Sequence, residues 1–165
     1  MPRNHILVPF KETGHAHQHC LESALSAAEK TCQLRGVRLT NIRRRVLELI
    51  WSSHEPVKAY DILDQLRDDH AGSAPPTVYR ALDFLQAEGM VHKIESLNAY
   101  VGCGDPSLSH TGQFLICREC GAVAEMDDKE VRKVLAEKAA LLGFKIDSEM
   151  IEMKGLCAIC ASVNS

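Results

Sequence analysis

The sequence predicts an α+β protein in two parts: a helical N-terminal part that ends in a β-hairpin, and a smaller α/β part. Three observations predict it. Apolar residues recur at helical spacing in four segments between residues 20 and 88. Two short stretches with strand composition, 91–95 and 99–101, follow these segments. Two Cys-x-x-Cys pairs, with 36 residues between them, lie in the last third of the chain.

The first nineteen residues are polar and rich in histidine, and no periodicity predicts an element there, so we expect a flexible tail. The residues from His15 to Cys20 have the composition of a metal chelator. Flexible histidine-rich tails bind metal adventitiously, so we expect no physiological role of this segment in metal binding. The start of the chain lacks the long apolar core of a signal peptide. No run of eighteen apolar residues predicts a membrane span. We therefore expect a cytoplasmic protein without membrane contact.

The helical part is expected to contain four helices. The first begins at Cys20 and ends at Gly36, with Cys32 packed on its apolar face, and the second follows Thr40 as its N-cap. Residues 51–56 connect to the third helix, 59–70. The fourth starts at Pro76 and stops before Gly89, since proline tolerates the first turn of a helix and glycine ends one. Helices followed by a hairpin are the layout of a winged helix-turn-helix domain.

After residue 101 the sequence pattern changes from mostly helical to a mixture of strands and one helix. Residues 102–106 are expected to be a hinge, followed by strands at 113–116 and 122–126 and a helix from Asp127, as its cap, to about residue 142. Residues 144–153 are expected to form a last strand. A unit this small usually needs a metal or an oligomer interface for stability. The expected domains are a tail (1–19), a winged-helix DNA-binding domain (20–101), a hinge (102–106) and a dimerisation and zinc-binding domain (107–165).

The cysteine pairs indicate a metal site. Two residues between cysteines allow both thiolates of one turn to face one ion, and two such turns complete the tetrahedral sulfur shell of a structural Zn²⁺. The alternatives are a redox dithiol or ordinary buried cysteines, the latter requiring a coincidence of spacing. Seven cysteines without a secretion signal also fit a reducing compartment, where thiolates bind metal. The predicted structural zinc ligands are Cys117, Cys120, Cys157 and Cys160.

The distribution of charge points to nucleic acid although the total does not. The chain carries a formal net charge of −3. Within it, Arg35, Arg38 and Arg43–Arg45 form a basic cluster without an intervening acid. Such a patch suits phosphate contact. It is equally compatible with a solvated helix face.

Several segments together resemble the ferric uptake regulator family, over roughly residues 22–162. The long motif PPTVYRALDFL, residues 75–85, is the most specific of them. The others are Arg38-Leu39-Thr40, Ala59-Tyr60-Asp61-Ile62-Leu63, Gly89-Met90-Val91-His92-Lys93 and 114–121. Within the family the chain is most similar to the zinc uptake regulators. The resemblance implies a homodimeric, zinc-dependent repressor of zinc-acquisition genes that binds palindromic operators in double-stranded DNA.

The resemblance also implies a second, regulatory zinc site near the hinge, held by His92, Cys103, His110 and Glu125. Each of these residues alone has an ordinary structural explanation, and Asp105, Asp127 and Asp128 remain possible substitutes for Glu125. A hairpin can bring His92 and Cys103 together, because residues 101 and 103 share one face of a strand. The thiol favours zinc, since a site for Fe²⁺ would be expected to use harder ligands. Two zinc ions per protomer are expected.

For DNA, Arg80 is the expected base reader, because arginine is the commonest bidentate partner of guanine. Tyr60, Thr77 and Tyr79 are candidates for phosphates or thymine methyl groups, and Arg43, Arg44 and Arg45 for phosphates. Tyr79 has packing at the helix-turn-helix corner as its alternative.

The predicted function is a zinc-responsive transcriptional repressor, with Zn²⁺ as corepressor. An iron- or peroxide-sensing regulator of the same family is the alternative, and a zinc-buffering protein a remoter one. We expect no enzyme and no small-molecule substrate, because neither the H-x-E motif of deaminases nor the H-E-x-x-H motif of proteases occurs.

Overall fold

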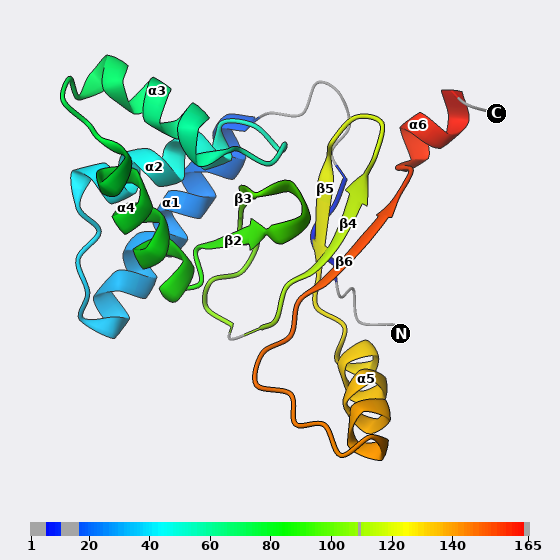
Figure 1. Cartoon of the computed structure of the whole chain (residues 1–165). Helices are drawn as coiled ribbons and strands as arrows, with labels where there is room; N and C mark the ends of the chain where they lie inside the picture. The colour runs from blue at the N-terminus through cyan, green and yellow to red at the C-terminus, as the bar shows by residue number, and fades with distance from the viewer. Residues whose placement is uncertain (1–5, 11–16, 109, 164–165) are drawn as a thin grey trace.

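The computed structural model describes residues 6–10, 17–108 and 110–163. It has two parts, which lie side by side in Figure 1. We call residues 17–102 the helical part, and residues 6–8 with 113–163 the sheet part. Within the described residues, no helix combines the length and apolar character needed to cross a membrane.

Four helices form the helical part: α1 (His17–Arg35), α2 (Asn41–Trp51), α3 (Ala59–Asp69) and α4 (Pro75–Ala87). Thr40 caps α2 as predicted, because its side chain accepts a hydrogen bond from the Arg43 N–H. Proline occupies the first turn of α4, where no N–H partner is needed. Gly89, at φ +71°, adopts the left-handed conformation that ends this helix.

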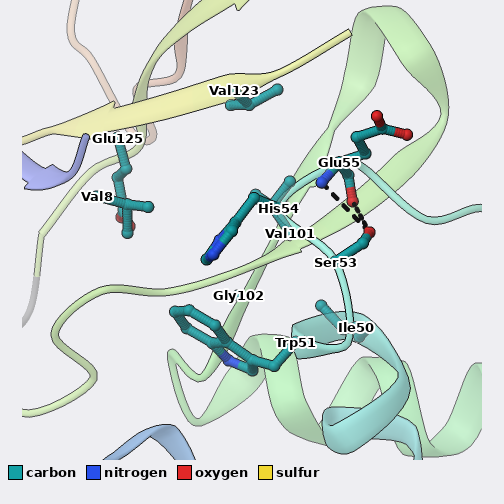
Figure 2. A pocket seen from close by; sticks show the side chains of 10 residues that line it. All are labelled: Val8, Ile50, Trp51, Ser53, His54, Glu55, Val101, Gly102, Val123 and Glu125. Carbon is teal, nitrogen blue, oxygen red and sulfur yellow. Dashed lines mark hydrogen bonds between the residues drawn. The ribbon is translucent and has the colours of Figure 1, made fainter. Parts of the chain in front are cut away.

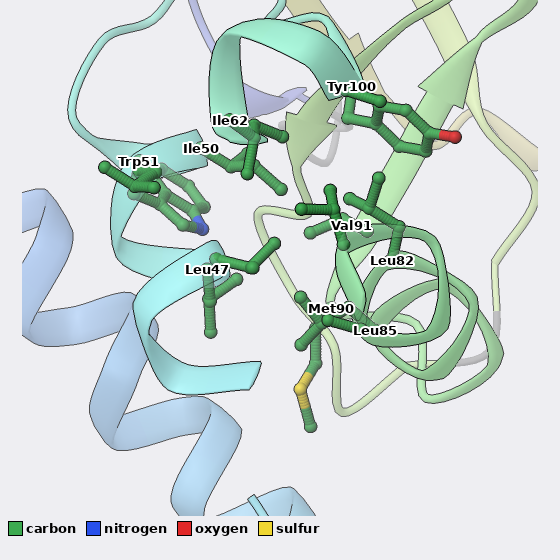
Figure 3. Packing of buried hydrophobic residues seen from close by; sticks show 14 of the residues in the cluster. Leu47, Ile50, Trp51, Ile62, Leu82, Leu85, Met90, Val91 and Tyr100 are labelled. Atoms are coloured by element: carbon green, nitrogen blue, oxygen red, sulfur yellow. The ribbon is translucent and has the colours of Figure 1, made fainter. Parts of the chain in front are cut away.

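The core of the helical part lies where α2, α3 and α4 meet the hairpin (Figure 3). Burying a leucine or isoleucine side chain stabilises a fold by roughly 1.5–3 kcal/mol. Cys32, which was predicted to pack on the apolar face of the first helix, also belongs to this core and is only 3% exposed. The largest fully buried side chains of the cluster are Leu47, Ile50, Ile62, Leu63, Leu66, Leu82, Leu85 and Met90.

The hairpin consists of β2 (Val91–Ile94) and β3 (Ala99–Gly102), joined by the short 3₁₀ helix η1 (Glu95–Leu97). The strands are antiparallel, with His92 opposite Val101. A bridge between Val57 and Tyr100 ties the hairpin to the segment before α3. The result is the predicted winged helix-turn-helix arrangement.

The sheet part contains β1 (Ile6–Val8), β4 (Gln113–Cys117), β5 (Val123–Met126) and β6 (Ile151–Gly155), in the order β1-β5-β4-β6. Strand β4 runs antiparallel to β5 and parallel to β6. The helix α5 (Lys129–Leu141) leads from β5 toward β6, and α6 (Ala158–Val163) follows β6. Because β4 and β6 are parallel, with Cys117 opposite Gly155, both cysteine pairs lie at the same end of the sheet.

The prediction of a tail over residues 1–19 is wrong for the part that the structure describes. Residues 6–8 form β1 on β5, and α1 begins at His17 rather than Cys20. The segment Ile-Leu-Val has strand composition, but an edge strand of three residues needs a partner that only the tertiary structure reveals. The remaining residues of the predicted tail, 1–5 and 11–16, lie outside the described residues.

Two boundaries in the sheet part also differ, and one short helix was not predicted. Asp128, not Asp127, caps α5, since its carboxylate accepts hydrogen bonds from two N–H groups of the first turn. Asp127 instead pairs with Arg132 at 2.7 Å. The last strand covers only residues 151–155, because pairing with β4 begins at Ile151. The helix α6 follows the second cysteine pair and is too short to show a periodic pattern.

Candidate metal centres and nucleic-acid interface

The four cysteines of the two pairs lie together. β4 ends at Cys117, and a turn that closes with a hydrogen bond from the Gly121 N–H to the Cys117 carbonyl brings Cys120 round. β6 ends two residues before Cys157, and Cys160 follows on α6. The four sulfur atoms lie within 4.8 Å of one another, and 3.9 Å separates those of Cys120 and Cys157. This cluster of Cys117, Cys120, Cys157 and Cys160 is the four-cysteine site.

This geometry fits a tetrahedral zinc ion. Four sulfur atoms at about 2.3 Å from one ion are about 3.8 Å apart. Hydrogen bonds from the backbone of Cys120 and Cys157 lower the pKa of Cys117 to about 6, so a thiolate is favoured there. Hydrogen bonding to Cys157 raises the pKa of Cys160 to about 12. A divalent cation is therefore what would allow all four thiolates to form together.

The second cluster joins the two parts. His92 comes from β2, Cys103 directly follows β3, and Glu125 lies on β5. His110 lies in the segment between β3 and β4, residues 103–112, which we call the connector. Their donor atoms lie within 4.8 Å of one another. Nε2 of His110 lies 3.4 Å from Sγ of Cys103 and 2.8 Å from Oε1 of Glu125, and Nε2 of His92 also lies 2.8 Å from that oxygen. We call these four residues the hinge site.

The backbone positions the hinge ligands. His92 pairs with Val101, and the Cys103 N–H donates to the Met90 carbonyl, so the hairpin continues through Cys103. Side chains at 92, 101 and 103 therefore share one face, in agreement with the expected alternation. The Gly104 N–H donates to Oε2 of Glu125 at 2.8 Å, a contact that no sequence pattern signals.

The hinge site also suits a metal ion chemically. Glu125 is 2% exposed. Burial alone would raise the pKa of its carboxyl, but the hydrogen bond from His110 and the close approach of His92 lower this pKa to about 2, so the buried group is a carboxylate. Burial and the charge of Glu125 raise the pKa of the Cys103 thiol. A metal ion would have to displace the proton of this thiol.

A buried nitrogen atom of His92 also favours a metal ion in the hinge site. Among the described residues, the buried Nε2 of His92 lies 2.8 Å from Oε1 of Glu125, yet makes no hydrogen bond of acceptable geometry. A buried donor or acceptor of this kind is costly unless another partner completes it. The possible substitutes for Glu125 have other partners: Asp105 accepts from Ser107, Asp127 pairs with Arg132, and Asp128 caps α5.

The helical part and the sheet part pack closely against each other around a small pocket next to Glu125. Figure 2 shows Trp51 and His54 of the helical part across from Val8 and Glu125. Gly102 is required here, because a Cβ atom at that position would lie 2.1 Å from the Trp51 ring. A Cβ at Gly104 would lie 2.8 Å from the carbonyl oxygen of Leu7, so β1 passes directly beside the connector.

The candidate DNA surface is formed by α3 and α4. Tyr60 is 65% and Tyr79 41% exposed, and both border a small pocket between the two helices. Thr77 lies in the first turn of α4, and Arg80 follows one turn later. The Arg80 side chain is exposed and donates to the Pro76 carbonyl at 3.2 Å. An arginine folded along its own helix can extend toward a ligand at little cost.

The three consecutive arginines of α2 have intramolecular partners that the sequence did not predict. Arg43 stacks on Phe84, 3.5 Å above the ring centre. Arg44 forms an ion pair with Glu29, and Arg45 forms ion pairs with Asp69 at 2.5 Å and Glu48 at 3.2 Å. These contacts hold α1, α3 and α4 against α2, so the basic cluster has a structural role besides any contact with phosphate.

Comparison with known proteins decides the family. The model of the Ferric uptake regulator family matches residues 34–154. The chain belongs to the ferric uptake regulator family. Among relatives, the Zinc uptake regulation protein of Escherichia coli (strain K12) is 44% identical over 147 residues, which cover 87% of this chain and 85% of the relative.

Solved structures of this family repeat the two-part arrangement. A zinc uptake regulator complexed with zinc and DNA matches with a TM-score of 0.80 and 43% identity, over 93% of this chain and 99% of that one. Holo XcZur matches with a TM-score of 0.78 and 49% identity, over 85% of this chain and 98% of that one. Apo XcZur is 46% identical over 86% of this chain and 97% of that one, but its TM-score is only 0.50. This chain is thus more similar to the holo structure than to the apo structure.

Proposed function

We propose that this protein is a zinc-responsive transcriptional repressor, a cytoplasmic homodimer that binds palindromic operators of zinc-uptake genes when zinc is bound. The observation that carries the proposal is the hinge site. Its thiol, two imidazoles and carboxylate come from both parts of the chain, so an ion held there depends on their relative orientation. The names of the relatives, zinc uptake regulators with one solved on DNA, support the same function.

We propose two zinc ions per protomer. The four-cysteine site would hold a structural ion, because its ligand set is complete without water. The hinge site would hold the regulatory ion, with His92 and Cys103 from the hairpin, His110 from the connector and Glu125 from the sheet. The bound ion supplies a divalent charge and coordination bonds, which compensate the buried carboxylate and the displaced thiol proton.

The proposed mechanism is selection of one orientation. The closed arrangement brings the hairpin onto the sheet, and zinc stabilises it because only this arrangement presents all four ligands. Each recognition helix, α4, would then have a fixed position relative to the dimer axis. Two such helices fit successive major grooves, about 10–10.5 base pairs apart or a multiple of that spacing. The winged helix of residues 20–101 would bind DNA, and residues 107–165 would dimerise.

Zinc is favoured over iron by the Cys103 thiol. Thiolate ligands select softer metals such as zinc, whereas Fe²⁺ prefers harder donors. The deciding experiment is a gel shift on a palindromic promoter fragment from a zinc-uptake gene, with Zn²⁺, Fe²⁺ or a chelator. We expect the protein to retard the DNA fragment when Zn²⁺ is present, and not when Fe²⁺ or the chelator is present. Retardation with Fe²⁺ but not Zn²⁺ would instead support the iron-sensing alternative, and none with either metal would contradict a metal-dependent repressor.

We expect a homodimer formed by residues from about Gly104 onward. The apolar residues of α5 are not buried within the chain: none of the helix residues is buried, and exposed apolar side chains continue beyond it. An exposed apolar surface of this kind marks an interface. Sedimentation should give twice the chain mass, and a monomer at micromolar concentration with zinc bound would contradict the prediction. The exposed apolar residues of α5 and of the chain from there to Met153 are Val134, Leu135, Leu141, Leu142, Phe144, Ile146, Met150 and Met153.

Arg80→Ala is expected to weaken operator binding by about 1–3 kcal/mol and to relax sequence preference, as for loss of a base reader. Arg44→Ala is the matched comparison, since it removes the same charge from a phosphate-contact candidate. It should lower the affinity for operator and random DNA alike and reduce the salt dependence. Fluorescence anisotropy on both DNAs separates these effects. Unchanged discrimination by Arg80→Ala would show that another residue reads the operator.

A further inference from the structure

Glu152 connects the sheet part to the tip of the hairpin. This residue lies on β6, and its carboxylate accepts hydrogen bonds from backbone N–H groups of η1. The Glu95 N–H donates to Oε1 at 2.7 Å, and the Ser96 N–H donates to Oε2 at 3.2 Å. The Glu95 side chain itself pairs with Lys93 at 3.0 Å. The contact therefore uses one carboxylate and the backbone of the hairpin, and none of the hinge ligands.

Next to this contact, the hairpin rests on the sheet through apolar side chains. Ile94, the last residue of β2, is completely buried and clusters with Phe114, Ile116 and Val123 of the sheet. Leu97 of η1 and Val101 of β3 pack against this cluster. The hydrogen bonds of Glu152 lie at the exposed edge of this contact, and a charged acceptor makes them stronger than bonds between neutral groups.

The hinge site and Glu152 hold the two ends of the same hairpin. His92 and Cys103 lie toward its base, whereas Glu95 and Ser96 lie at its tip. Three residues along a strand separate His92 from Glu95, which corresponds to about 10 Å. An ion that binds at the base alone leaves the hairpin free to pivot about that point. A second fixed point at the tip removes this freedom.

We propose that Glu152 is a positioning residue for the zinc response: it holds the tip of the hairpin on the sheet and so favours the orientation in which the hinge site is assembled. The inference rests on the proposed function, because it assigns to Glu152 a part of the energy of closing. Metal affinity scales with the fraction of molecules already in the binding-competent orientation. Loss of the contact should thus weaken zinc binding at the hinge without removing a ligand.

Glu152→Ala tests this inference. Zinc titrations of operator binding, by fluorescence anisotropy in a zinc buffer, should show a midpoint about fivefold higher than that of the unmodified protein, as expected for loss of two charge-assisted hydrogen bonds partly replaced by water. At saturating zinc the operator affinity and the metal content should return to the original values. Glu152→Gln keeps one acceptor oxygen and should give an intermediate midpoint.

Glu22→Ala is the control, since it removes the same charge from an exposed site on α1, away from the proposed dimer interface and DNA surface. Hydrogen exchange supplies a direct readout: the Ser96 amide should exchange faster in Glu152→Ala. The Tyr100 amide, which donates to the Val57 carbonyl within the helical part, should not change. A lower melting temperature with an unchanged zinc midpoint would reduce Glu152 to a structural residue and overturn the inference. If the unmodified protein showed no zinc-dependent operator binding, the proposed function itself would be wrong.

Discussion

Replacement of Cys117 or Cys160 by serine is expected to abolish the folded dimer. The four-cysteine site joins the ends of two parallel strands in a small sheet, and its metal contributes directly to folding. Structural zinc contributes about 10–16 kcal/mol in small domains, which matches or exceeds the usual net stability of a protein. Circular dichroism and size-exclusion chromatography should show unfolded, aggregated or monomeric protein. Unmodified protein stripped of all metal by a strong chelator should behave identically.

Cys20→Ser is a suitable control, because this cysteine of α1 lies outside both clusters. It should leave the dimer and its metal content unchanged. A folded, dimeric Cys117→Ser variant with full metal content would mean that the sulfur cluster is not the structural site.

The second prediction concerns the hinge. Cys103→Ser or His92→Ala should retain a folded dimer with the structural zinc and yet lose zinc-stimulated operator binding. The hinge site is assembled from both parts of the chain, so the conformational cost of closing makes it weaker and exchangeable. Native mass spectrometry should count two zinc ions per protomer in the unmodified protein and one in either variant. Operator affinity at saturating zinc should fall to that of the unmodified protein that retains only its structural zinc.

The same Cys20→Ser variant controls for loss of a thiol elsewhere in the chain. Should Cys103→Ser still bind two zinc ions and repress normally, the regulatory ion would lie elsewhere. The histidine-rich segment before α1 would then be the next candidate.

Much of the fold was predictable because local signals agree with the tertiary structure. The Thr40 cap, the proline that opens α4 and the glycine that ends it act within a few residues, and apolar periodicity reports the buried faces of the helices. Strand β1 was not predictable, since its stability comes from pairing with β5, more than a hundred residues away. The strand expected from residue 144 failed for the converse reason: strand composition needs a neighbouring strand, which starts to pair only at Ile151.

The candidate sites differ in how much the sequence reveals. The spacing of the cysteine pairs predicted one cluster directly, because each pair needs only a local turn. The hinge residues His92, Cys103, His110 and Glu125 were suggested by family resemblance, and the structure places their donor atoms together. Spacing alone does not relate a hairpin to a strand of another domain. The ion pairs of Arg44 and Arg45 and the contact of Glu152 with the hairpin tip were missed, since each joins distant segments without a motif.

Strand β1 makes the helical part an insertion between two segments of one sheet. The chain enters from β1 on one side and returns through the connector to β4, and Leu7 lies directly beside Gly104. A body attached at one point can swivel in every direction. Attachment through two segments that lie side by side at Leu7 and Gly104 restricts such motion to bending about a single line. Fewer orientations are then available before metal binds, so less conformational entropy opposes closure, and a modest number of coordination bonds suffices to complete it.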